Sequence, residues 1–120
     1  MSCLFNSLSY FFNLKSENIR NIICNYLETN GKIIEDLDTE FVLALDNVSK
    51  DNYIHEMKKQ STWGGAIEIK AACNIWNVKI IVHNIRNINN VKCIEFLPIS
   101  STFRKTLNIT WNGHHYEPIK

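Results

Sequence analysis

Apolar residues in the first quarter of the chain recur at helical spacing. The segment Leu4 to Phe12 is apolar enough to predict a buried first helix, with its end at Asn13 to Lys15. Ser16 is a good N-cap residue for a second helix, which Asn30-Gly31 is expected to end. The apolar positions of this second helix are Ile19, Ile22, Ile23, Tyr26 and Leu27. The pattern therefore predicts an amphipathic helix directly after a buried one.

The pattern is less regular in the middle of the chain, where short apolar groups between Lys32 and Lys59 are mixed with charges. It predicts only one helix around Phe41 to Leu45 and another around Asp51 to Lys59. Apolar residues then fall at i, i+3, i+4 and i+7, namely Ile69, Ala72, Cys73 and Trp76. This spacing predicts a further helix with one apolar face.

The last third of the chain has the pattern of β-strands. Val78 to His83 is a short β-branched run, Lys92 to Leu97 is similar, and Thr106 to Trp111 alternates apolar with polar residues. Asn112-Gly113 marks a tight turn, after which His115 to Ile119 is expected to return as the second strand of a hairpin. Helices first and strands last predict an α+β fold, in which helices pack against a small, mainly antiparallel sheet.

Composition narrows the class of protein. The chain has 120 residues, 45% hydrophobic and 21% charged, which predicts one folded domain over residues 1–120. A net charge of +1 without a basic stripe disfavours nucleic-acid binding, and no segment has the pattern of a signal peptide or a membrane span. The four cysteines are scattered without metal-binding spacing, so we expect reduced thiols, a cytoplasmic monomer and no metal.

Two residues far apart in the sequence stand out for their chemistry. Cys3 lies at the start of an apolar helix, where the helix dipole and free N–H groups stabilise a thiolate and an oxyanion. His115 is a candidate base, because a catalytic Cys–His pair can be distant in sequence and close in space. The alternative is that Cys3 is a small buried apolar residue, as expected for Cys24 and Cys73, and that His115 is a surface residue.

Three blocks of the sequence resemble one family, in the same order along the chain. Residues 3–8 read CLFNSL, similar to the block that opens the nucleophile helix of ovarian tumour (OTU) cysteine peptidases. Residues 63–68 read WGGAIE and residues 114–119 read HHYEPI, which resemble the family's tryptophan-glycine-glycine segment and its terminal histidine-tyrosine block. The resemblance covers nearly the whole chain and implies a papain-like OTU fold.

The resemblance also implies catalytic roles. Cys3 corresponds to the nucleophile, and His115, directly before the tyrosine, corresponds to the general base. Glu117 stands where the family often has an Asp or Asn that orients the imidazole, although a solvated surface charge is an equal alternative for Glu117.

Five further residues are implied to bind the substrate: Trp63, Gly64, Gly65, His114 and Tyr116. The tryptophan-glycine-glycine segment is expected to shape the floor of the substrate groove or the start of the next helix. For Trp63 itself, a place in the hydrophobic core is the stronger expectation.

The activity that the resemblance implies is thiol acyl transfer without a cofactor. OTU peptidases generally cleave peptide or isopeptide bonds after the C-terminal Gly-Gly of ubiquitin or of a ubiquitin-like protein. Conjugates of these modifiers are therefore the expected partners, and a deubiquitinase is the expected enzyme.

One departure from the family pattern concerns the residues before the cysteine. The family usually has an Asp-Gly-x loop there, which supplies N–H donors to the oxyanion, whereas only Met1 and Ser2 precede Cys3. A lost oxyanion donor typically costs about 10²–10³ in rate, and a chain terminus frays unless it is tied down. The chain is then either an OTU domain truncated at its N-terminus, or an impaired relative that binds ubiquitin or serves a structural role. In a third reading Cys3 is a structural thiol far from His115.

Overall fold

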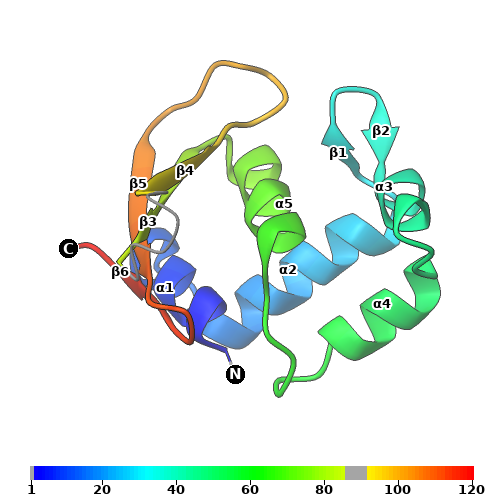
Figure 1. The fold of residues 1–120 in the computed structure, drawn as a ribbon, viewed down its shortest axis with the longest axis horizontal. Coiled ribbons are helices and arrows are strands. Elements are labelled where there is room, and N and C mark those ends of the chain that lie inside the picture. The colour runs from blue at the N-terminus through cyan, green and yellow to red at the C-terminus, as the bar shows by residue number, and fades with distance from the viewer. Residues whose placement is uncertain (1, 86–91) are drawn as a thin grey trace.

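The order of elements is the expected one, with helices first and strands last, except for a short hairpin inserted after the second helix. The computed structural model describes residues 2–85 and 92–120 (Figure 1). Its helices are α1 (Cys3–Phe12), α2 (Ser16–Glu28), α3 (Thr39–Leu45), α4 (Lys50–Met57) and α5 (Ala66–Trp76). Its strands are β1 (Lys32–Ile34), β2 (Leu37–Asp38), β3 (Lys79–Asn84), β4 (Cys93–Phe96), β5 (Thr106–Trp111) and β6 (Tyr116–Pro118). No helix within the described residues has the length and apolar character needed to cross a membrane.

The predicted helices are all present, with small differences at their ends. Helix α1 ends at Asn13, which takes a left-handed conformation with φ of 55° and donates its N–H to the Ser9 carbonyl. The predicted N-cap role of Ser16 is wrong, because Lys15 occupies the N-cap position and Ser16 is already helical. A lysine provides no side-chain oxygen for the free N–H groups there.

The sheet is mixed, with strand order β4-β3-β5-β6. Both outer pairings are antiparallel, as expected, and the hairpin of β5 and β6 follows the predicted Asn112-Gly113 turn. The central pairing is parallel, from Lys79 opposite Thr106 to Asn84 opposite Trp111. The sequence analysis did not predict this parallel pair, nor the short β1–β2 hairpin.

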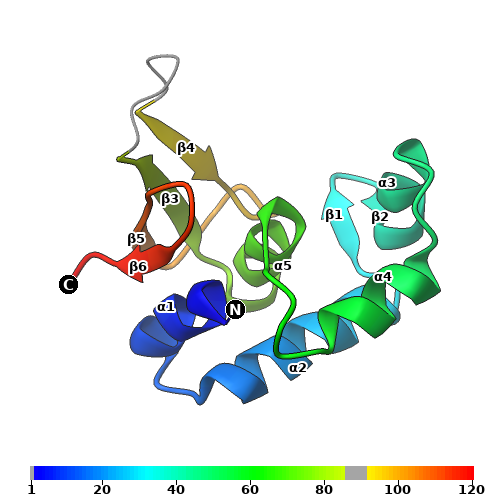
Figure 2. The same ribbon diagram turned by 60° about the horizontal axis from the view of Figure 1, so that its bottom comes forward.

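The first helix and the last strand are neighbours in space. Helix α1 packs against both β6 and α2, while α5 contacts α2 on one side and strands β3 and β4 on the other (Figure 1, Figure 2). Stacking of the Phe12 ring on Trp76, with centroids 4.3 Å apart, joins α1 to the end of α5. The core between these layers is formed by fully buried side chains, including Phe5, Leu8, Ile23, Leu27, Ile69, Ile80 and Ile109. This packing brings the start of α1 beside the turn that leads into β6.

Candidate active site

A pocket of about 470 Å³ lies where α1 meets β6. Its lining residues are Cys3, Asn6, Ser7, His115, Tyr116, Glu117, Pro118 and Lys120. The structure thus places Cys3 and His115, which are at opposite ends of the sequence, on the wall of one cavity. The reading in which Cys3 is a structural thiol far from His115 does not fit this arrangement.

Cys3 is the first residue of α1 and is partly exposed. Hydrogen bonds fix the backbone around it: the Ser7 hydroxyl donates to the Cys3 carbonyl at 2.9 Å, and the Asn6 N–H donates to the Ser2 carbonyl at 2.7 Å. No acidic residue lies in the first turn of the helix. Cys3 therefore lies at the N-terminal end of a ten-residue helix whose own first turn contains no carboxylate that would oppose a thiolate.

The segment before Cys3 is tied down by Arg20, whose residue surface is only 2% exposed. The guanidinium donates to the Ser2 hydroxyl at 3.2 Å and to the carbonyls of Met57 and Gln60, at 2.8 and 3.3 Å. The Ser2 hydroxyl in turn donates to the Gln60 carbonyl at 3.3 Å. These hydrogen bonds hold Ser2 in place and oppose the fraying that is expected for the residues before Cys3. The sequence analysis missed Arg20, although it directly follows Ile19 on the buried face of its helix.

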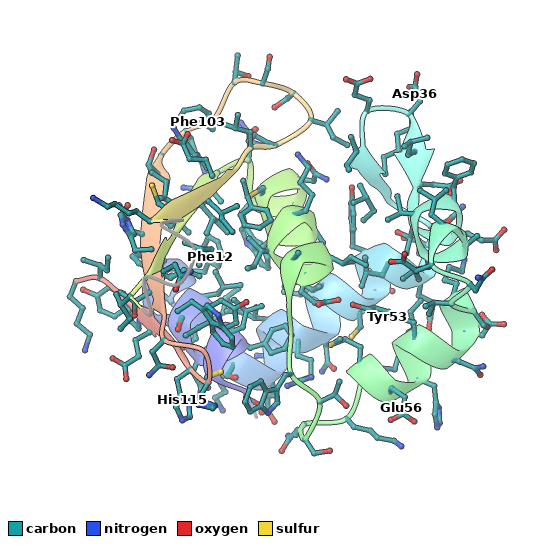
Figure 3. The ribbon with its side chains drawn as sticks, in the orientation of Figure 1. Phe12, Asp36, Tyr53, Glu56, Phe103 and His115 are labelled. Atoms are coloured by element: carbon teal, nitrogen blue, oxygen red, sulfur yellow. The ribbon has the colours of Figure 1, made fainter. Side chains whose placement is uncertain are left out.

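His115 lies on the turn before β6, beside α1 (Figure 3). Its side chain is exposed, and within the described part of the chain no hydrogen bond reaches its imidazole. Glu117 lines the same pocket and is also exposed, but it makes no hydrogen bond to His115. The structure therefore brings Glu117 near the pair without showing it in contact with the ring. His114 is exposed and is not part of the pocket lining.

The prediction that Trp63 belongs to the core is wrong, because 44% of its surface is exposed. Its ring stands edge-on to Trp111, with centroids 6.5 Å apart, and Trp111 in turn contacts Tyr116 at 4.6 Å. Tyr116 lines the pocket with Cys3. Burial raises the pKa of the Tyr116 hydroxyl, and the nearby Cys3 adds to this effect. A row of three aromatic rings thus leads from the surface to the pocket.

The two glycines of this block have different structural roles. A Cβ on Gly64 would come within 2.7 Å of a Leu4 methyl and 3.0 Å of the Phe5 ring, so glycine allows the loop to lie directly on α1. Gly65 is the N-cap of α5, and its N–H donates to Glu68 at 2.7 Å. Gly64 therefore lets the loop lie on the helix that carries Cys3, whereas Gly65 starts the next helix.

Glu68 is a buried carboxyl group, 1% exposed, behind this loop. It accepts hydrogen bonds from the Gly65 N–H and from the Tyr53 hydroxyl, at 2.7 and 2.5 Å. Burial raises the pKa of Glu68, while the Tyr53 hydrogen bond acts in the opposite direction. Among the described residues, no group of three or more His, Cys, Asp or Glu side chains is arranged to hold a metal ion.

Comparison with known proteins identifies relatives over almost the whole chain. Residues 2–118 match the family model described as OTU-like cysteine protease. The "Ubiquitin thioesterase OTU1" of Drosophila pseudoobscura pseudoobscura is 28% identical over 123 residues, covering 98% of this chain and 31% of the relative. The "Ubiquitin thioesterase otu2" of Schizosaccharomyces pombe is 27% identical over 124 residues, covering 94% and 38%. The chain thus spans about a third of the length of these relatives.

Solved structures support the same fold. An ovarian tumour domain in complex with ubiquitin superimposes with a TM-score of 0.76 at 27% identity, covering 98% of this chain and 62% of that one. The viral OTU domain protease of Dera Ghazi Khan virus gives a TM-score of 0.67 at 19% identity, covering 99% and 76%, and supports the fold alone. The arrangement of helices around a mixed sheet is therefore the OTU fold, and the chain belongs to the OTU-like cysteine protease family.

Proposed function

We propose that this domain is a thiol-dependent deubiquitinase that cleaves peptide or isopeptide bonds after the C-terminal Gly-Gly of ubiquitin or a ubiquitin-like protein. In this proposal Cys3 is the nucleophile and His115 the general base. The observation that carries it is the pocket that both residues line at the N-terminal end of α1. The relatives named ubiquitin thioesterases and the neighbouring structure with bound ubiquitin support the choice of modifier.

The reaction proceeds by acyl transfer through the thiol. His115 takes the proton of Cys3, and the thiolate attacks the carbonyl carbon of the terminal glycine. The negative charge on the tetrahedral oxygen is stabilised by free N–H groups at the start of α1. The intermediate collapses to a thioester as the amine leaves with the proton from the imidazolium. His115 then removes a proton from water, which attacks the thioester and releases the carboxylate and the free thiol.

The aromatic row beside the pocket suits a substrate that ends in two glycines. Trp63 and Tyr116 offer flat apolar faces, Gly64 keeps the adjoining loop close to α1, and Gly65 caps the helix that follows. We assign these four residues to substrate binding, together with the exposed His114. A segment that consists only of glycine needs little space beside these residues, because it has no side chains to accommodate.

Glu117 is the third residue of the proposed catalytic set. Glu117 would orient the His115 ring when substrate closes the pocket, because both residues line this pocket.

The protein would act as a monomer in a reducing compartment such as the cytoplasm. The free state of its cysteines, Cys3, Cys24, Cys73 and Cys93, favours such an environment.

The test is covalent labelling with ubiquitin that carries an electrophile at its C-terminus. We expect an adduct that mass spectrometry maps to Cys3 and that is lost in both Cys3→Ala and His115→Ala. Cys93→Ala is the matched control, since Cys93 is an exposed thiol on the edge strand β4, and this variant should label like the wild type. A folded wild-type protein that binds ubiquitin but forms no adduct would instead favour a non-catalytic ubiquitin-binding module. Parallel probes made with other modifiers decide between ubiquitin and its relatives.

A further inference from the structure

One residue holds the backbone of His115 from both sides. The side-chain oxygen of Asn112 accepts hydrogen bonds from the backbone N–H groups of His114 and His115, at 2.8 and 2.7 Å. The backbone N–H of Asn112 donates to the carbonyl of His115 at 3.2 Å. The N–H and the C=O of His115 are therefore both bound to Asn112.

The hydrogen bonds between Asn112 and His115 lie beyond the paired residues of β5 and β6. The last paired residues of the hairpin are Trp111 and Tyr116, so His115 is outside the register of β5 and β6. The loop between them turns through Gly113, whose φ of 98° is accessible mainly to glycine. Short hairpin loops open locally at low free-energy cost unless side chains close them. Asn112 closes this loop through its own side chain.

The position of the His115 imidazole depends on these hydrogen bonds of Asn112, because no hydrogen bond of the described residues holds the ring itself. The ring is exposed and receives no hydrogen bond from Glu117 or from any other described residue. Its location relative to Cys3 is then set by the backbone at residue 115 and one side-chain rotamer. A displacement of about 1 Å between reacting groups can cost about 10²-fold in rate.

We propose that Asn112 is a positioning residue for His115: its side-chain amide oxygen clamps the backbone of the turn and so holds the base beside Cys3. This inference rests on the proposed function, in which His115 is the base. Asn112 does not touch the substrate in this scheme, and it acts only through the backbone of His115. This role requires a hydrogen-bond acceptor oxygen on the side-chain carbon next to Cβ. Asp has such an oxygen, as Asn does, and Ala has none.

Three variants test this role. Asn112→Ala removes the acceptor, Asn112→Asp retains an oxygen at the same position, and Asn21→Ala is the control, since Asn21 is an exposed asparagine of α2 away from the pocket. On a fluorogenic ubiquitin substrate, we expect Asn112→Ala to lower kcat by about 10- to 100-fold with KM unchanged. The kcat of Asn112→Asp should lie within a few-fold of the wild-type value. The kcat of the control Asn21→Ala should equal the wild-type value.

The amide hydrogen exchange of His115, followed by NMR, tests the clamp without catalysis. Exchange should be at least about tenfold faster in Asn112→Ala and close to wild type in Asn112→Asp. An unchanged kcat in Asn112→Ala, a rise in KM alone, or no recovery in Asn112→Asp would overturn the positioning role. If the wild type itself forms no Cys3 adduct, the proposed function fails, while unchanged exchange in Asn112→Ala refutes the clamp separately.

Discussion

The guanidinium carbon of Arg20 lies 4.2 Å from the centre of the Phe5 ring, within the core. A desolvated cation over an aromatic face gains about 2 kcal/mol, and hydrogen bonds to carbonyl groups offset part of the cost of burying the charge. Burial lowers the pKa of Arg20, and the nearby Cys24 and Glu68 act in the opposite direction. The cation thus joins α1, α2 and the end of α4 behind the candidate active site.

Replacement of Arg20 should destabilise the whole fold. Arg20→Met keeps much of the side-chain volume but leaves the carbonyl of the buried Met57 without the guanidinium donor and removes the cation from the Phe5 ring. Since an unsatisfied buried polar group costs about 1–3 kcal/mol, we expect the free energy of unfolding to fall by about 3–5 kcal/mol. Urea denaturation followed by circular dichroism measures this loss.

Arg104→Met is the matched control for this substitution. Arg104 is exposed, and its side chain donates a hydrogen bond to the Trp76 carbonyl at 3.0 Å. Its replacement should cost less than about 1 kcal/mol, because water can satisfy the released groups. Equal losses in the two variants would contradict a special role of the buried guanidinium.

Substitution by alanine should cost more stability at Gly64 than at the neighbouring Gly65. In Gly64→Ala the new methyl group overlaps Leu4 and Phe5, so we expect a loss of about 1–3 kcal/mol in the free energy of unfolding and weaker labelling of Cys3. In Gly65→Ala the nearest atom to the new methyl group is a Glu68 oxygen at 3.9 Å, and the loss should stay below about 1 kcal/mol. Thermal unfolding of the pair compares them directly. A larger loss at Gly65 would show that the loop does not rest on α1 as described.

Stability should fall at alkaline pH because of two buried thiols. Burial raises the pKa of Cys24 and Cys73 from 9.0 to about 11. Between these values the unfolded chain releases thiol protons that the folded chain retains, so the free energy of unfolding decreases as pH rises from about 9 to 11. Each thiol contributes a slope of up to about 1.4 kcal/mol per pH unit.

The double variant Cys24→Ala/Cys73→Ala isolates this contribution. Its free energy of unfolding should be lower than that of the wild type at neutral pH, because of the lost volume, but should depend less on pH above 9. Cys93→Ala, at an exposed thiol, should leave the wild-type slope unchanged. Parallel slopes for all three proteins would show that other groups cause the alkaline loss.

Glu117 should matter less for catalysis than His115. His115→Ala removes the proposed base and is expected to lower kcat/KM by about 10²–10⁴. Glu117→Ala removes a carboxylate that makes no hydrogen bond to the ring, so the expected loss is below about tenfold. Glu95→Ala, on the opposite edge strand of the same sheet, serves as the control and should be neutral. A loss at Glu117 as deep as that at His115 would contradict this assisting role and would make Glu117 as necessary as His115.

The elements that the sequence predicted well are those with strong local signals. Apolar spacing located α2 and α5, and the Asn112-Gly113 pair located the hairpin of β5 and β6. The β1–β2 hairpin was missed because strands as short as Leu37–Asp38 have no detectable period. The parallel pairing of β3 with β5 was missed because alternation along a strand does not identify its partner.

Errors in the candidate site came from residues whose environment depends on distant segments. The size of Trp63 suggested the core, but the ring rests on Trp111, about fifty positions away in the sequence, and stays exposed. No feature of the sequence singled out Arg20, because only the fold brings the Met57 and Gln60 carbonyls to its guanidinium. The pairing of Cys3 with His115 came from family resemblance, since no local pattern relates two residues so far apart.

The contact of α1 with β6 has a consequence for biosynthesis. During translation the thiol of Cys3 leaves the ribosome early, whereas the turn that carries His115 follows only after all the other helices and strands of the domain. Contacts between such distant segments form late, since they need the intervening chain to be ordered. A nascent or partly folded chain therefore has the Cys3 thiol without His115 beside it, and in the proposed mechanism no conjugate is cleaved until the last strand has docked.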